Sequence, residues 1–293
     1  MFRQLSFLSR LFPCLVALTF HALAQQDTIL VFNEVMYHPA DTDTEWVELV
    51  NLNGVDVDIS HWSLDGAVNY TFPEGTVARG NSYLVVAADP SQVPGSMGPF
   101  SGRLDDGGEE LRLLNNSERV MCILDYNDRG DWPVAPDGSG ATLAKGNPEL
   151  LASEAASWYG SAEIGGTPGS VNFPDGVVPP IIQFNEVAGL SADPFFVEIG
   201  FCPCPDPLAD AVLPLAGYQV RTSGGDTYSF TDQTIVVGGL LSVSSETLGF
   251  ENLQNGDRLY LLPPELDRVL DAVVLRQRTR ARFPDGETWR IAT

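Results

Sequence analysis

The stretch ILVFNEVMYHPADTDTEWVELVNLNGVDVDISHWSLDG, residues 29–66, decides the fold because a weaker copy of it recurs farther along the chain. Its opening returns as IIQFNEV at residues 181–187, and FFVEI at residues 195–199 stands where the first copy has EWVEL. A repeat spaced this widely indicates tandem domains rather than a solenoid. Each copy is therefore expected to fold around its own core.

Short runs rich in β-branched and aromatic residues alternate with polar turns throughout the first copy. Residues 31–35 and 46–50 are predicted strands, and Asn53-Gly54 and Asp65-Gly66 are typical of tight turns. The pattern continues to residue 124 without helical periodicity. It predicts an all-β fold, built as an antiparallel β-sandwich.

The order of these motifs resembles the lamin tail domain family, in particular the versions exported by bacteria. The similarity rests on FNEV, EWVELVN, DISHWSLDG, YTFPEGTVARGNSYLVVAADP and GEELRLLNNSERVMCILDY, which follow one another up to residue 126. The resemblance implies an immunoglobulin-like β-sandwich. It specifies a fold more firmly than a function.

Exported members of this family commonly carry an appended tail, and similar motifs follow here. They are Tyr126, Asp131-Trp132-Pro133, Asp137-Gly138-Ser139-Gly140, Ser157-Trp158, and the GGTPG of residues 165–169 with Asn172.

The repeat and the family resemblance together predict two tandem immunoglobulin-like sandwiches. The predicted boundaries are a first sandwich at residues 25–126, its tail at 127–172, a linker at 173–180 and a second, divergent sandwich at 181–293. The prolines of the linker make it stiff, which favours a fixed relation between the units.

The second copy resembles the first only in part. Pro284-Asp285-Gly286 is similar to Pro136-Asp137-Gly138 of the first tail, but no GGTPG-like segment follows before Thr293. The second copy is therefore expected to lack a complete tail. Either the sequence is part of a longer protein or this copy dispenses with the tail.

Residues 1–24 have the pattern of a secretory signal peptide. Arg3 and Arg10 give a positive start, residues 11–20 form a short apolar run, and Ala22-Leu23-Ala24 fits a cleavage site. The apolar run is shorter than the roughly 20 residues that span a bilayer. A mature protein that begins at Gln25, and is secreted or held at the cell surface, is the expectation.

A formal net charge of −23 excludes most nucleic-acid binders, because phosphate recognition needs concentrated lysine and arginine. Acidic surfaces suit calcium or basic partners, or serve only as a solvated exterior. The loop with Asp41, Asp43 and Glu45 spaces its acids at alternate positions and is the calcium candidate. It lacks the full signature of a calcium-binding loop, as does the cluster of Asp105, Asp106 and Glu109. No other cofactor is predicted.

Asn-Glu pairs occur at matching places in both copies. Asn33-Glu34 corresponds to Asn185-Glu186, and Glu48 and Glu198 occupy the same place in the next strand. Because strand side chains alternate, these acids face away from the neighbouring apolar positions. The pairs predict a contact that holds the first strand to the second. The alternative is a repeated acidic stripe that faces a ligand.

Cleavage of the signal peptide leaves three cysteines. Cys122 lies in a predicted strand, which favours a buried thiol, whereas Cys202-Pro203-Cys204 lies in a proline-rich loop. The two cysteines of that loop are candidates for a strained bridge or a metal site, but a structural or incidental role is favoured, because their spacing is not that of a zinc site. The pairing of the three stays open.

The residues of a catalytic site are sparse. Only His38 and His61 remain in the mature chain, and both lie in the first copy. Neither has a convincing nucleophile in the sequence, and Gly138-Ser139-Gly140 lacks the strand-to-helix context of a nucleophile elbow. His61 is interpreted as a surface residue. The loop from His38 to Glu45 is absent from the second copy, so it is where a function of the first unit is expected.

Three functional hypotheses follow. The first is an exported, non-catalytic tandem sandwich that binds, displays or adheres through a protein or carbohydrate at the cell surface. The second is an accessory part of a longer secreted enzyme, such as a nuclease, phosphatase or kinase-like protein, since such fusions are common in the family that the sequence resembles. The third, and least favoured, is a hydrolase that uses the acidic residues.

Overall fold

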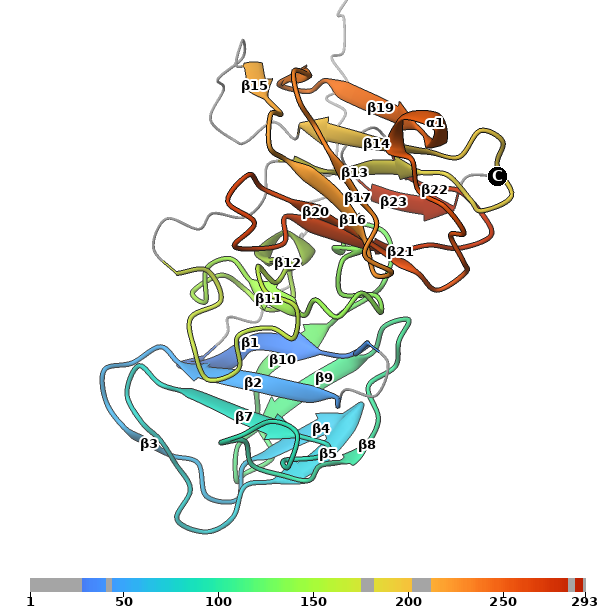
Figure 1. Ribbon diagram of the computed structural model, residues 1–293. Coiled ribbons are helices and arrows are strands. Elements are labelled where there is room, and N and C mark those ends of the chain that lie inside the picture. Colours follow the sequence, from blue (N-terminus) through green and yellow to red (C-terminus); the bar gives the residue numbers. More distant parts are fainter. Residues whose placement is uncertain (1–27, 41–43, 175–181, 202–211, 284–287, 292–293) are drawn as a thin grey trace, which may run out of the picture.

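The chain forms two β-sandwiches stacked one on the other in the computed structural model (Figure 1). The structure describes residues 28–40, 44–174, 182–201, 212–283 and 288–291. We call residues 28–174 the first unit and residues 182–291 the second unit. All paired strands are antiparallel, and the prediction of an all-β fold with two tandem immunoglobulin-like sandwiches is confirmed.

The first unit packs two five-stranded sheets face to face. The first sheet has the order β12 (Trp158–Gly160), β11 (Leu143–Lys145), β1 (Leu30–Met36), β2 (Trp46–Asn51) and β7 (Tyr83–Ala87). The second has the order β10 (Val120–Asp125), β9 (Glu110–Leu114), β4 (Ser63–Gly66), β5 (Val68–Thr71) and β8 (Ser101–Gly102). A two-stranded ribbon joins β3 (Val57–Asp58) to β6 (Val77–Ala78), and a 3-10 turn, η1 (Ala155–Ser157), precedes β12.

The second unit repeats this topology, but its second sheet has four strands because no counterpart of β8 pairs with β17 among the described residues. One sheet has the order β23 (Thr288–Ile291), β22 (Arg280–Phe283), β13 (Ile182–Val187), β14 (Phe196–Phe201) and β19 (Leu240–Ser244). The other has the order β21 (Asp271–Val274), β20 (Arg258–Leu262), β16 (Gln219–Thr222) and β17 (Thr227–Ser229). A ribbon joins β15 (Val212–Pro214) to β18 (Thr234–Val236), and one short helix, α1 (Ser245–Leu248), follows β19.

A β-bulge at the same place in both units explains why Phe-Asn-Glu recurs. The register between β1 and β2 shifts between Phe32 and Glu34, and that between β13 and β14 shifts between Phe184 and Glu186. Each bulge therefore contains an asparagine. A bulge adds one residue to a strand and re-aims the neighbouring side chains, so residues on both sides of it can be buried.

Each sandwich has its own apolar core, as separate sheets require. Phe32, Phe72 and Tyr126 are fully buried in the first core, and Phe184 and Phe230 are buried in the second. Cys122 is also fully buried in the first core, as the sequence predicted. Burying aromatic and aliphatic side chains of this size contributes about 1.5–3 kcal/mol each relative to exposing them.

The tail, residues 127–172, lies between the two sandwiches rather than beyond the first (Figure 1). Its strands β11 and β12 extend the first sheet beside β1, and its Trp158 packs in the first core. Val134, near its start, packs in the second core. The tail is therefore shared by both units, and it fixes their relation through packing, whereas most of the predicted linker lies outside the described residues.

The end of the second unit takes the place of the tail strands. β22 occupies beside β13 the place that β11 occupies beside β1, since Glu34 pairs with Ala144 and Glu186 with Ala281. β23 pairs with β22 as β12 pairs with β11. The segment Pro284-Asp285-Gly286, which is similar to part of the first tail, lies outside the described residues.

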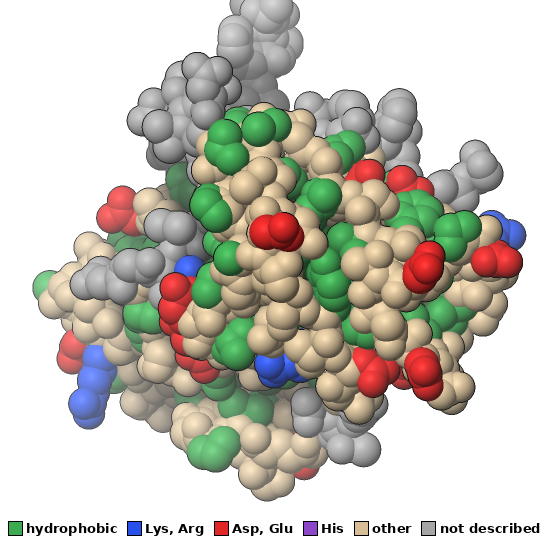
Figure 2. All heavy atoms as spheres, turned by 45° about the horizontal axis from the view of Figure 1, so that its top comes forward, with side chains coloured by type: hydrophobic (Ala, Val, Ile, Leu, Met, Phe, Trp, Pro, Cys, Tyr) green, Lys and Arg blue, Asp and Glu red, His purple; other side chains and the backbone are tan. Residues whose placement is uncertain are grey.

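Acidic side chains are dispersed over the exterior. On the face shown in Figure 2, they lie at several separate places among neutral and hydrophobic side chains, and few lysine or arginine side chains are visible.

Candidate functional site

The calcium candidate is only partly placed. Asp41 and Asp43 lie outside the described residues. The carboxylate of Glu45 accepts hydrogen bonds from the backbone N–H of Leu104, at 2.8 Å, and from Arg103 Nε, at 3.2 Å. Among the described residues, no group of three or more His, Cys, Asp or Glu side chains is arranged to hold a metal. Calcium binding at Asp41, Asp43 and Glu45 stays a prediction.

The predicted contact between the paired asparagines and glutamates is confirmed in both units. Asn33 Nδ2 donates to Glu48 Oε1 at 2.7 Å, and Asn185 Nδ2 donates to Glu198 Oε1 at 2.9 Å. In each case the bulge asparagine of the first strand binds the glutamate of the second. These side chains hold two strands together, which is the architectural role expected from their recurrence.

The first unit adds a buried carboxylate pair that the second unit does not reproduce. Glu34 lies opposite Glu48 in the ladder, and both are fully buried, whereas Glu186 and Glu198 are only half-buried. Burial raises the pKa of Glu34 to about 7 and that of Glu48 to about 8, although hydrogen bonds oppose both shifts.

The tail covers this pair and supplies further donors besides Asn33. The hydroxyl of Thr142 and the backbone and hydroxyl of Thr167 donate to Glu34, and Gly169 N donates to Glu48 Oε2 at 2.6 Å. Gly166 approaches so closely, with φ of 75°, that an added Cβ would lie 2.6 Å from Glu34 Oε1. The GGTPG motif is thus the lid of a buried polar network.

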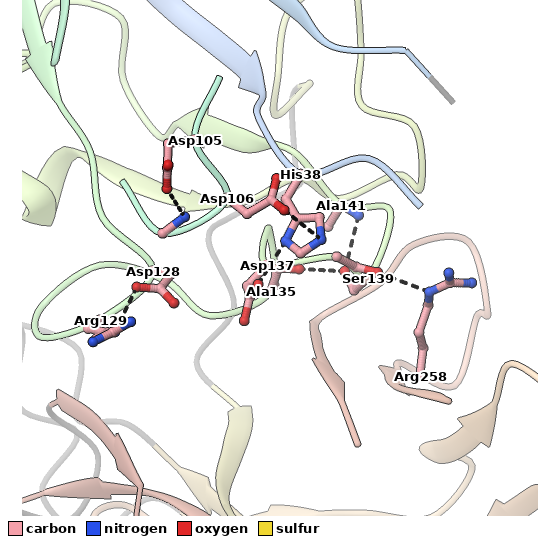
Figure 3. Close-up of polar contacts among 12 residues, drawn as sticks. His38, Asp105, Asp106, Asp128, Arg129, Ala135, Asp137, Ser139, Ala141 and Arg258 are labelled. Atoms are coloured by element: carbon pink, nitrogen blue, oxygen red, sulfur yellow. Dashed lines mark hydrogen bonds and ion pairs between the residues drawn. The ribbon is translucent and has the colours of Figure 1, made fainter. Parts of the chain in front are cut away.

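His38 marks the centre of the second polar cluster (Figure 3). Its Nδ1 lies 2.9 Å from Asp137 Oδ1, and its Nε2 lies 3.8 Å from Asp106 Oδ2. The hydrogen bond with Asp137 raises the pKa of His38, and burial opposes this in part. Gly138 permits the contact, because it has φ of 76° and its Cβ would stand 3.1 Å from the imidazole.

Asp137 also reaches the second unit. Its Oδ2 pairs with Arg280 Nη1 at 3.1 Å, and both side chains are largely buried. Burial opposes ionisation of Asp137, but His38 and Arg280 outweigh it, so its pKa is lowered. Nearby, Arg258 Nε donates to the carbonyl of Gly138 at 3.0 Å, and Tyr260 donates to that of Ser139 at 3.0 Å.

These contacts form the floor of a cleft between the units. Two adjoining cavities of about 610 Å³ and 970 Å³ open there, and both are lined by His38 and Arg276. Such volumes are in the range of small-molecule sites. We call this feature the interunit cleft. It is lined by residues of the loops after β1 and β8 and of the tail on one side, and by the segments around β20–β22 on the other.

Two residues weighed as catalytic candidates are used otherwise. The Ser139 hydroxyl is fully buried, donates to the Ala135 carbonyl and accepts from Ala141 N at 3.1 Å, so it stabilises a turn (Figure 3). His61 is on the surface, as predicted, with Nε2 2.7 Å from exposed Glu74.

The sequence analysis identified His38 as part of a functional loop but did not identify the residues that face it across the cleft. These belong to the arginine-rich segment RQRTRAR, residues 276–282, which supplies the opposite wall of the cleft. A signal was present, since arginines at alternate positions are unusual in a chain with 16 basic and 39 acidic residues. Asp137 was noted only as part of a tail motif.

None of the helices formed by the described residues is long and apolar enough to cross a membrane. Residues 1–27, which include the predicted signal peptide, lie outside that part of the chain.

Comparison with known proteins agrees with this architecture. No curated protein matches the chain. Residues 24–128 match the family described as Lamin Tail Domain. This segment holds the bulged β1, its partner β2 and the remaining strands up to β10. Residues 24–128 of this chain therefore belong to the lamin tail domain family.

Proposed function

We propose that this chain is an exported, non-catalytic binding protein whose ligand site is the interunit cleft. The observation that carries the proposal is the shared tail. Val134 packs in the second core while Trp158 packs in the first, and Asp137 joins His38 to Arg280. The cleft walls belong to different sandwiches but are held in a fixed relation, as a preorganised site requires.

Three further features support this reading. An immunoglobulin-like domain of the lamin tail family is compatible with a binding module. The cleft has the size of a ligand site, with polar groups from several elements converging on it. Export rests on the pattern of residues 1–24, with cleavage after Ala24.

The test is capture of ligands from the envelope and culture medium of producing cells by immobilised mature protein. A Gly107→Tyr variant would place a ring in the cleft, because Gly107 lines the larger cavity and an added Cβ there meets only the Asp105 side chain, at 3.3 Å. Gly54→Tyr is the matched control, since Gly54 lies in an exposed turn that does not line the cleft.

Retention of a ligand by the wild type and Gly54→Tyr, and its loss by Gly107→Tyr, is expected. Equal retention by all three proteins would place binding elsewhere. Amino-terminal sequencing of the exported protein should start at Gln25, and a protein retained in the cytoplasm with residues 1–24 intact would refute export.

A further inference from the structure

The interunit cleft collects a large part of the protein's positive charge. Six arginines line its two cavities: Arg103, Arg129, Arg258, Arg276, Arg278 and Arg280. Four carboxylates line it as well: Glu45, Asp106, Asp128 and Asp137. The imidazole of His38 adds a further donor. This balance is the reverse of that of the whole chain, in which acids outnumber bases.

Every carboxylate in the cleft already has a cationic partner. Arg103 pairs with Glu45 and Asp106, Arg129 with Asp128, and Arg280 with Asp137, at distances between 3.0 and 3.2 Å. The neighbouring Arg258 donates to a backbone carbonyl of the floor. The local acids are therefore satisfied without the remaining two arginines.

The two arginines of the cleft that pair with no local acid are Arg276 and Arg278. Within the part of the chain that the structure describes, neither guanidinium has an ion pair or a side-chain hydrogen bond. Arg276 lies near enough to His38 to lower the pKa of that imidazole. Cations that converge on one cavity repel one another, and an anion between them would relieve the repulsion.

We propose that the interunit cleft binds a compact oxyanion, a phosphate group or a closely spaced pair of carboxylates, through Arg276, Arg278 and His38. The planar guanidinium presents N–H donors in a fork that matches carboxylate and phosphate oxygens. The proposal rests on the proposed binding function and specifies the chemistry of its ligand.

The ligand is a small molecule rather than a long polyanion. A net charge of −23 repels an extended chain of negative charges that must pass over the acidic exterior. A compact anion inside the cleft instead experiences mainly the nearby arginines, because charges beyond about 8–10 Å are screened at physiological salt.

The test is titration calorimetry of the mature protein with inorganic phosphate and with citrate, in a buffer without competing oxyanions. Binding of at least one is expected with a stoichiometry of one. Arg276→Gln and Arg278→Gln should each weaken it by about tenfold or more, as the loss of a charged hydrogen bond implies. Arg119→Gln is the matched control, since Arg119 is exposed in the turn before β10, outside the cleft.

Each remaining outcome has a defined meaning. If neither anion binds, or if the cleft variants and Arg119→Gln behave alike, the oxyanion inference is wrong. If heparin binds more tightly than citrate and phosphate, the commitment to a small ligand is wrong. If neither phosphate nor citrate binds but Gly107→Tyr still abolishes capture of a ligand from cell fractions, the cleft binds a different class of ligand. In that case the oxyanion inference is wrong, whereas the proposed binding function stands. Unchanged melting temperatures of the arginine variants would show that they remain folded.

Discussion

Asp137 and Arg280, 143 positions apart in the chain, form a largely buried ion pair of 3.1 Å that joins the tail of the first unit to the second unit. The other oxygen of Asp137 contacts His38 at 2.9 Å. Three segments remote in sequence thus meet at one carboxylate. The stability of the two-unit assembly is expected to depend on it.

Replacing Asp137 by asparagine should separate the unfolding of the two units. The change keeps the side-chain shape but leaves Arg280 without its charge partner, and breaking a buried pair in this way costs about 3 kcal/mol or more. Calorimetry should show a lower first transition and broader or split unfolding. Asp226→Asn, at an exposed turn, is the control. Identical traces for the two variants would contradict a role for this pair.

The same contact should govern the titration of His38. Its pKa is raised by Asp137, so removing that carboxylate should lower it. Proton NMR titration of the wild type and Asp137→Asn measures this directly, with the resonance assigned through His38→Gln. A midpoint that does not move between the two proteins would show that the hydrogen bond is not formed in solution.

This interface should be weakened at both ends of the pH scale. The pKa of His38 is higher in the folded protein than in the unfolded chain, where it is about 6.5. Its contribution to stability is therefore complete below about pH 6.5 and is lost as pH rises through the pKa of the folded protein. The lowered pKa of Asp137 contributes stability that is present above its unfolded value and is lost as pH falls through the folded value. Urea unfolding across the pH range should show both losses in the wild type. The double variant that combines His38→Gln with Asp137→Asn should show neither loss.

Buried Glu34 should make the protein less stable as pH rises from about 4.5 to about 7. Over this interval the folded protein holds a proton that the unfolded chain has released, because burial raises the pKa of Glu34 from 4.5 to about 7. The loss is on the order of 3 kcal/mol. Glu34→Gln should make this part of the curve of unfolding free energy against pH less steep, with the remaining slope due to Glu48, whereas exposed Glu149→Gln should leave it unchanged. Parallel curves for both variants would place the proton elsewhere.

The lid formed by the tail can be tested through one hydroxyl. Thr167 Oγ1 donates to Glu34 Oε2 at 3.0 Å, and Thr167→Val should cost about 1–2 kcal/mol of unfolding free energy and raise the pKa of Glu34 further. Thr76→Val removes a hydroxyl that donates at 2.7 Å to the carbonyl of Pro73 in an exposed turn. It should cost less than half as much, and an equal cost in urea unfolding would contradict the importance of the lid.

Repetition within the sequence was informative because it separates what the fold requires from what one unit requires. Phe-Asn-Glu recurs since each unit needs the bulge and the asparagine that binds the next strand. The His38 loop does not recur, and it lies at the interunit cleft. Glu34 and Glu48 do recur, but the repeat gave no signal of their full burial, because that burial depends on tail residues more than 100 positions away.

The sequence by itself determined the local pattern: short alternating strands, turn positions, the family of the first unit and the two-unit order. These follow from side-chain periodicity and turn chemistry, which act between residues close in the chain. Only the tertiary structure decided that the tail lies between the sandwiches, that Asp137 bridges His38 and Arg280, and that Arg276 and Arg278 face a cleft. Those relations depend on packing between segments more than 90 residues apart, and no local pattern records which surfaces will meet.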